Sequence, residues 1–352
     1  MIKDVIQKLV EKKDLTDGEA IEIMSEIMSG EAKPSQIASF LTALRMKGET
    51  VEEITAFAKV MRERSLRINP QVNGKMIDTC GTGGDKVKTF NISTCAAFVI
   101  AGAQVTVAKH GNKAVTSSCG SADLLENFGL KLDVEPRSVE EAVEKVGIGF
   151  LYAPAFHPAM KHATPVRREI CIRTVFNILG PLVSPAQVSN QVLGVYTPDL
   201  VEPLSYVLRN LGSESAMVVH GLDGLDEVST IGITRISHLQ KGMVKVYELS
   251  PGDFGVKKAD PTEVKSSTLE GNVETAFKIL TGKLKKGAKR DAVLVNASVG
   301  LVVARKTDDF KDGMELGRES IDSGRAYNKL RELVHFHGND VSKLEELERR
   351  FA

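Results

Sequence analysis

The first 70 residues place apolar side chains at the spacing of amphipathic helices. Ile2, Val5, Ile6, Leu9 and Val10 would line one face of a helix, and charged residues occupy most of the positions between them. Similar patterns recur three more times, separated by brief turns. We therefore predict a small all-helical domain over residues 1–70.

Two of these helices carry a clear start signal. Thr16 with Glu19, and Thr50 with Glu53, have the spacing of a capping box, in which each side chain satisfies a backbone amide of the other residue. Gly30 marks the end of the first of these helices, because glycine readily adopts the left-handed conformation that follows many helix C-termini. The pattern predicts that each helix begins just after its threonine.

From about residue 75 short apolar runs such as MIDTC, VTVA, IGFLYA and AMVVHG alternate with helical patterns. Alternation of strand and helix is typical of a largely parallel α/β sheet. The segment 231–249 predicts a β-hairpin, and we expect the proline-punctuated helical stretch 156–181 to fold back onto the N-terminal helices. The predicted fold is α/β, with a helical domain over 1–70 and a larger domain with a mostly parallel sheet over 71–352.

The composition is that of an ordinary globular enzyme, with 42% hydrophobic and 26% charged residues. Lys plus Arg and Asp plus Glu both number 46, which argues against a general nucleic-acid binder, since such proteins usually carry a basic excess. No apolar run approaches the roughly 20 residues of a membrane span, and the N-terminus does not resemble a signal peptide. The four cysteines lack zinc-type spacing. We therefore expect reduced thiols and a cytoplasmic protein without a membrane or nucleic-acid partner.

A glycine loop, GTGGD, follows the predicted strand MIDTC, and a hydroxyl-rich NIST opens a helix shortly afterwards. Ligands of α/β sheets bind at the carboxyl ends of the strands, where glycine amides and a helix N-terminus can hold an anion. Asn91 is the candidate N-cap, with Ser93 and Thr94 in the first turn. A dinucleotide fingerprint would need glycine where Lys86 stands, and no GK[ST] of a P-loop is present. Taken alone, the pattern also fits a tight turn before an ordinary capped helix.

Two other polar segments follow predicted strands. Residues 109–123, KHGNKAVTSSCGSAD, concentrate hydrogen-bond donors behind the strand VTVA, although a polar surface loop would look similar. Asp226 and Glu227 lie in a glycine-rich loop behind AMVVH. Adjacent acids are most often a solvated surface pair, but beside a phosphate loop their hard oxygens suit magnesium. Asp85, next to the phosphates, would more readily bind a sugar hydroxyl or loop amides.

GTGGD, NIST, KHGN and the later LDE together resemble the anthranilate phosphoribosyltransferase family, over nearly the whole chain. GTGGD is shared with pyrimidine-nucleoside phosphorylases. KHGN followed by GSAD, HPAMKHATPVRREI and FNILGPL is much more specific. The resemblance implies transfer of phosphoribosyl from phosphoribosyl pyrophosphate to anthranilate, within tryptophan biosynthesis. The family's usual arginine is Lys113 here, and Thr116 stands where serine is more usual.

The resemblance also implies a set of donor-binding residues around the two segments. The phosphoribosyl pyrophosphate would be bound by Gly81, Gly84, Asp85, Thr89, Asn91, Ile92, Ser93, Thr94, Lys109, His110, Gly111, Asn112, Lys113, Ala114, Val115, Thr116, Ser117 and Ser121. Magnesium, as two ions, would be held by Ser93, Asp226 and Glu227.

On the acceptor side the resemblance implies a second set of residues. Anthranilate would contact Gly81, His110, Asn112, His157, Arg167, Gly180 and Pro181. An aryl carboxylate needs a planar bidentate donor, and the resemblance selects Arg167 over its neighbour Arg168. The residues expected to act in catalysis are Lys109, Arg167, Asp226 and Glu227. We expect a dissociative displacement at the anomeric carbon that requires no strong protein base.

Two rival functions stay open at this point. A pyrimidine-nucleoside phosphorylase shares the glycine loop, but it uses inorganic phosphate and has no need of the acidic pair. Some relatives of the family bind nucleic acid and lack the catalytic set, which the zero net charge disfavours. Relatives are typically homodimers that pair through their N-terminal helices, and we expect the same arrangement here.

Overall fold

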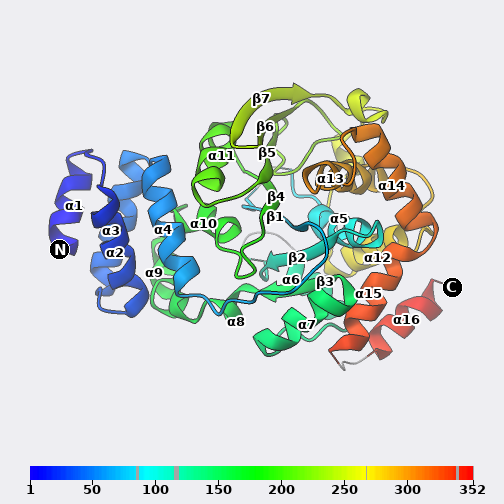
Figure 1. Ribbon diagram of the computed structural model, residues 1–352, viewed down its shortest axis with the longest axis horizontal. Coiled ribbons are helices and arrows are strands. Elements are labelled where there is room, and N and C mark those ends of the chain that lie inside the picture. Colours follow the sequence, from blue (N-terminus) through cyan, green and yellow to red (C-terminus); the bar gives the residue numbers. More distant parts are fainter. Residues whose placement is uncertain (85–86, 115–118, 267, 338–340, 352) are drawn as a thin grey trace.

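The computed structural model describes residues 1–84, 87–114, 119–266, 268–337 and 341–351. A small bundle of helices precedes a larger α/β domain built around one sheet (Figure 1). The predicted fold class is therefore confirmed. Among the described residues no helix is long and apolar enough to cross a membrane.

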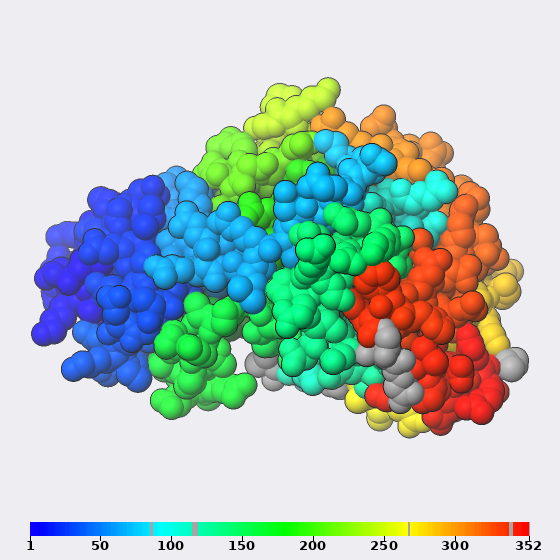
Figure 2. Space-filling view, turned by 60° about the horizontal axis from the view of Figure 1, so that its bottom comes forward, coloured from blue at the N-terminus to red at the C-terminus, as the bar shows by residue number. Residues whose placement is uncertain are grey.

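The bundle contains α1 (Ile2–Val10), α2 (Asp17–Ser29), α3 (Pro34–Lys47) and α4 (Val51–Glu63). A later segment of short helices packs against it. This segment consists of α8 (Ala153–Phe156), η1 (Pro158–His162), α9 (Thr164–Ile170) and α10 (Phe176–Leu182). In it η1 contacts α2, α9 contacts α3, and α10 contacts α4. Figure 2 shows the bundle in blue as a lobe at one end of the molecule, with the green segment beside it.

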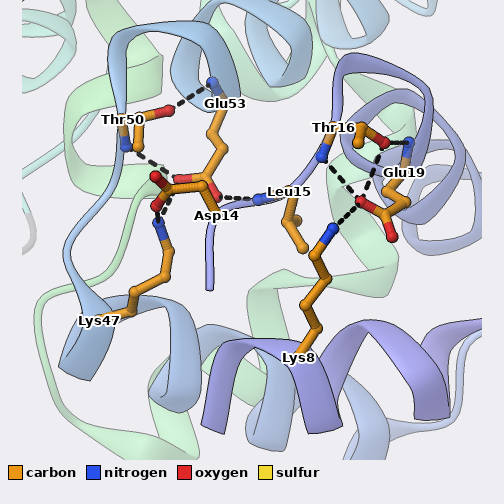
Figure 3. Close-up of polar contacts among 8 residues, drawn as sticks. All are labelled: Lys8, Asp14, Leu15, Thr16, Glu19, Lys47, Thr50 and Glu53. Atoms are coloured by element: carbon orange, nitrogen blue, oxygen red, sulfur yellow. Dashed lines mark hydrogen bonds and ion pairs between the residues drawn. The ribbon is translucent and has the colours of Figure 1, made fainter. Parts of the chain in front are cut away.

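Both predicted capping boxes form (Figure 3). The Glu19 amide donates to Thr16 Oγ1 at 3.3 Å, while the Thr16 amide donates to Glu19 Oε2 at 2.7 Å. The second box is more deeply buried: the side chain of Glu53 is fully covered and pairs with Lys47 Nζ at 2.9 Å. The Thr50 amide donates to Glu53 Oε2, also at 2.9 Å. The start of α4 is thus locked by a buried ion pair that joins it to the end of α3.

One seven-stranded sheet has the order β3-β2-β1-β4-β5-β6-β7. Its strands are β1 (Met76–Gly81), β2 (Thr106–Gly111), β3 (Ile148–Tyr152), β4 (Asn190–Gly194), β5 (Ser215–Gly221), β6 (Thr234–Gln240) and β7 (Met243–Leu249). The first five strands in this order are parallel, and β6 and β7 form the predicted antiparallel hairpin. In such a sheet β1, β2 and β4 end at the same edge, where their following loops meet.

Helices cover both faces of the sheet (Figure 1). The remaining helices are α5 (Ile92–Gly102), α6 (Ser121–Asn127), α7 (Pro136–Val146), η2 (Pro198–Leu200), α11 (Val201–Asn210), η3 (Pro251–Phe254), η4 (Pro261–Glu263), α12 (Leu269–Leu280), α13 (Ala288–Val303), α14 (Phe310–Asp322), α15 (Arg325–Phe336) and α16 (Ser342–Arg350). One large apolar cluster joins α5 and α13 to one face. A second is continuous from the bundle through α10 and α11 to the other face. The bundle is therefore anchored by a core that it shares with the sheet.

Candidate active site

The loop after β1 passes across the end of β4 and the acidic loop. The Thr82 amide donates to the Gly194 carbonyl at 2.9 Å, and the Gly83 amide donates to Asp226 Oδ2 at 2.8 Å. Gly83 and Gly84 have φ values of 67° and 79°, in the left-handed region that favours glycine. The glycines thus allow a tight turn at the edge of the sheet, held by the Gly194 carbonyl and the Asp226 carboxylate.

The acidic pair lies directly against this turn. A Cβ atom on Gly81 would stand 2.5 Å from Asp226 Oδ2, and one on Gly194 would stand 1.6 Å from the Asp226 carbonyl oxygen. Burial of Asp226 raises the pKa of its carboxyl group, and the hydrogen bond from the glycine loop opposes that shift. Glu227 Oε1 accepts from the amide of Ser93 at 3.2 Å. The two carboxylates therefore bridge the glycine loop and the first turn of α5.

Asn91 occupies the N-cap position of α5, as predicted, but its side chain makes no capping hydrogen bond. Its Nδ2 donates instead to the Cys119 carbonyl at 3.0 Å. Asn91 Oδ1 is buried without a partner among the described atoms. Thr79 Oγ1 donates to the Ser93 carbonyl at 3.1 Å, which ties β1 to the first turn. The start of α5 is thus linked to β1 and to the 109–123 segment.

Lys109, His110 and Gly111 do not lie in a loop, contrary to our expectation, because β2 continues through all three residues. Pairing with β3 extends the strand, with Lys109 opposite Phe150. The Lys109 side chain is buried, and its ammonium group donates to the Thr79 carbonyl beneath the glycine loop. Its positive charge therefore lies under the loop.

The chain beyond β2 turns back onto the start of α6. The Asn112 carbonyl accepts from Ser121 Oγ at 3.2 Å. Lys113, predicted to bind the donor, forms an ion pair with Glu126 at 2.7 Å. Thr89 forms an isolated antiparallel bridge with Lys265. The predicted site residues Asp85, Val115, Thr116 and Ser117 lie outside the described residues.

Three of the predicted acceptor residues, His110, His157 and Gly180, lie close together. The rings of His110 and His157 lie 5.2 Å apart between centroids. Burial lowers the pKa of His110 to about 3 and that of His157 to about 4, so both rings are neutral near pH 7. His110 Nδ1 lies 3.2 Å from the Gly180 carbonyl, which can only accept, so Nδ1 carries the proton. The Nε2 atoms of both rings are buried without a partner among the described atoms.

Arg167 stands on α9 with its guanidinium 5.2 Å from the ring centre of Phe176. The residue is half-buried, and this burial lowers the pKa of its guanidinium. In the described part of the chain it has no ion pair or side-chain hydrogen bond. A planar cation in this setting is well suited to a carboxylate.

Two buried side chains that the sequence did not single out connect the two sides of the site. Asp78 Oδ1 accepts from the His110 amide at 3.2 Å, and burial raises the pKa of Asp78 to about 6. Gln191 Nε2 donates to the Pro181 carbonyl at 2.6 Å and lies 3.5 Å from Asp78 Oδ2. A polar residue inside an apolar strand was the available signal in both cases.

Arg173 and Asp123 were also missed. Arg173 Nη2 donates to the Gly84 carbonyl at 2.8 Å, with its guanidinium 4.4 Å from the ring centre of Tyr196. Asp123 Oδ2 accepts from the amides of Ala114 and Gly120, at 2.8 and 2.9 Å. The approach of Gly84 to Arg173 and of Ala114 to Asp123 is revealed by no local pattern, whereas the bond from Gly120 is local to the start of α6.

Two family models identify the class of protein to which the chain belongs. The model of the glycosyl transferase family helical bundle domain matches residues 3–65, and the model of its a/b domain matches residues 73–327. The anthranilate phosphoribosyltransferase of Acetivibrio thermocellus is 50% identical over 342 residues, which cover 97% of this chain and 98% of the relative. The chain therefore belongs to the anthranilate phosphoribosyltransferase family.

Solved structures agree with this assignment. The enzyme of Thermus thermophilus has a TM-score of 0.89 and 42% identity, with 95% of this chain and 99% of that chain covered. The Saccharomyces cerevisiae enzyme, described in complex with PRPP and Mg, has a TM-score of 0.88 and 30% identity, with 95% and 97% covered. A second structure of the yeast enzyme, at 28% identity and a TM-score of 0.86, is in complex with 4-fluoroanthranilate. Each of the three solved structures matches 95% of this chain.

Proposed function

We propose that this protein transfers the phosphoribosyl group of 5-phosphoribosyl 1-pyrophosphate to the amine of anthranilate, releasing pyrophosphate. This is a step toward tryptophan. The observation that carries the proposal is the contact between the acidic pair and the donor side of the site. Asp226 accepts from the Gly83 amide, and Glu227 accepts from the Ser93 amide. The family of the chain supports the same reaction.

The residues present fit magnesium. Two carboxylates and the Ser93 hydroxyl offer hard oxygens, and protein sites usually hold Mg²⁺ through one or two carboxylates together with substrate phosphates. We assign Ser93 and Glu227 to one ion, and Asp226 and Glu227 to a second. The magnesium in the yeast complex supports the metal. When bound, the ions neutralise charge that develops on the leaving pyrophosphate.

The protein's own groups on the donor side supply the rest of that stabilisation. We expect the amides of Gly81, Gly84 and the first turn of α5 to act as fixed dipoles toward the donor, because such dipoles cost no reorganisation during the reaction. Lys109 adds a positive charge beneath the loop. We also propose that all the donor-side residues implied by the family resemblance bind the phosphoribosyl pyrophosphate. A domain boundary near residue 70 is supported by the family matches, which end at residue 65 and begin again at residue 73.

On the acceptor side Arg167 would bind the anthranilate carboxylate, and Gly180 and Pro181 would wall its channel. The bare Nε2 atoms of His110 and His157 suit the amine as hydrogen-bond acceptors. Such weakly basic rings are poor bases for a free amine. However, the amine becomes strongly acidic once its bond to the anomeric carbon forms, so a strong base is not required.

We also propose a cytoplasmic homodimer. Val10, Ile21 and Met46 are exposed apolar side chains on α1, α2 and α3, which suits pairing through the bundle. The four cysteines are all free thiols, which fits a reducing compartment.

The rival pyrimidine-nucleoside phosphorylase gives a direct test. Pyrophosphate release should occur with the phosphoribosyl donor, anthranilate and magnesium, and thymidine plus phosphate should give no free base. Asp226→Asn and Glu227→Gln should both lower the rate and weaken its magnesium dependence. Phosphorolysis without pyrophosphate release would refute the proposal, and unchanged rates in both variants would refute the metal assignment.

A further inference from the structure

Asn296 is a buried polar residue in the middle of α13, a helix in the core of the α/β domain. Its Oδ1 accepts from the Val228 amide at 2.9 Å. Its Nδ2 donates to the Val228 carbonyl at 3.0 Å and to the Ala292 carbonyl at 2.9 Å. Both N–H groups of the carboxamide are therefore used. A primary carboxamide can pair with the N–H and the C=O of one residue at once because its acceptor and its donors are separate atoms.

Val228 directly follows Glu227, so this pairing fixes the backbone at one end of the acidic pair. At the other end the Asp226 carbonyl packs against Gly194, where even a Cβ atom would not fit. A cavity of about 10 Å³ lies between Asn296, Glu227 and Ser93, among other residues. Asn296 thus borders the same space as two of the assigned magnesium ligands without being one of them.

We propose that Asn296 is a positioning residue for the Asp226–Glu227 pair and thereby sets the affinity of the site for magnesium pyrophosphate. The loop between β5 and β6 has no strand partner at Val228, and α13 supplies one from the core. Groups that orient metal ligands typically change metal affinity by about 10- to 100-fold when they are removed. The inference rests on the proposed function.

The test is calorimetric titration of the full-length protein with magnesium pyrophosphate, because it reads binding rather than turnover. Asn296→Ala should weaken binding by about 10-fold. Asn190→Ala is the matched control. Asn190 is equally buried and donates to the Met76 carbonyl at 3.2 Å, but it begins β4 at the edge opposite the site. The Asn190→Ala variant should therefore bind magnesium pyrophosphate with the affinity of the wild type. In kinetics, Asn296→Ala should raise the KM for the phosphoribosyl donor and leave that for anthranilate unchanged.

Several outcomes would overturn the inference. One is an Asn296→Ala protein that binds magnesium pyrophosphate as tightly as the wild type, and another is an equal loss in both variants, which would indicate general destabilisation. If the wild type itself shows no magnesium-dependent binding, the proposed function fails first. Should Asn296→Ala not fold, hydrogen exchange of the wild type decides. The Val228 amide should exchange slowly without ligand, and exchange as fast as an exposed loop amide would contradict the pairing.

Discussion

Replacing Gly81 with alanine should displace the carboxylate of Asp226 with little strain in the backbone. The new Cβ atom would lie 2.5 Å from Asp226 Oδ2, whereas ordinary contact begins at 3.4 Å, so the oxygen must withdraw by 3.4 − 2.5 = 0.9 Å. Gly81 is not among the glycines with positive φ, so its backbone conformation tolerates alanine. The shift also disturbs the 2.8 Å hydrogen bond from Gly83.

A displacement of about 1 Å in a positioned group can cost about 100-fold in rate, or about 2.7 kcal/mol of transition-state stabilisation. Initial rates over a magnesium series should therefore show a lower maximum and a higher magnesium requirement for Gly81→Ala. Gly18→Ala, on α2 of the bundle, is the steric control, because its Cβ atom would meet nothing within 4 Å. Its magnesium dependence should match the wild type. A Gly81→Ala enzyme with wild-type rate and magnesium dependence would refute the placement of Asp226 in the metal site.

Three further changes probe other parts of the molecule. Arg167→Ala should raise the Michaelis constant for anthranilate more than that for the phosphoribosyl donor, and steady-state kinetics showing the reverse order would reject its role. Glu53→Ala should lower the free energy of unfolding by about 3 kcal/mol, measured in urea, because Lys47 keeps only its exposed partner Asp14 and the amides of Leu15 and Thr50 lose their acceptor. Stability should fall as the pH drops from about 6.5 toward 4, because the buried His110 and His157 bind protons only after unfolding. Protonation of each histidine in the unfolded chain should lower the free energy of unfolding by about 1.4 kcal/mol at about pH 5.5. In a pH series of melting curves, the melting temperature of His110→Gln should therefore fall less steeply with decreasing pH than that of the wild type.

Features that depend on neighbours in the sequence could be predicted. The capping boxes at Thr16 and Thr50 need only residues three positions apart, and both form. The alternation of strands and helices likewise gave the α/β class and the final hairpin. The glycine loop and the acidic pair were found because each follows an apolar strand.

Features that depend on distant partners were missed or misplaced. Lys109 was expected in a loop, but pairing with β3 extends the strand through it. Asn296 lies 68 positions from Val228, so its role appears only when α13 packs against the sheet. Lys113 pairs with Glu126 because α6 turns back toward β2, and the run of donors gave no indication of this. Such contacts are set by the order of strands in the sheet, which no local pattern determines.

The most direct test of the account is the fluorescence of anthranilate in the presence of phosphoribosyl pyrophosphate. The wild-type protein should consume anthranilate with magnesium and stop when EDTA is added. The double variant Asp226→Asn, Glu227→Gln should show almost no consumption under either condition. Undiminished consumption in EDTA, or by the double variant, would contradict a site in which the acidic pair holds magnesium. Absence of consumption by the wild type, in an assay where a known family member is active, would contradict the proposed function.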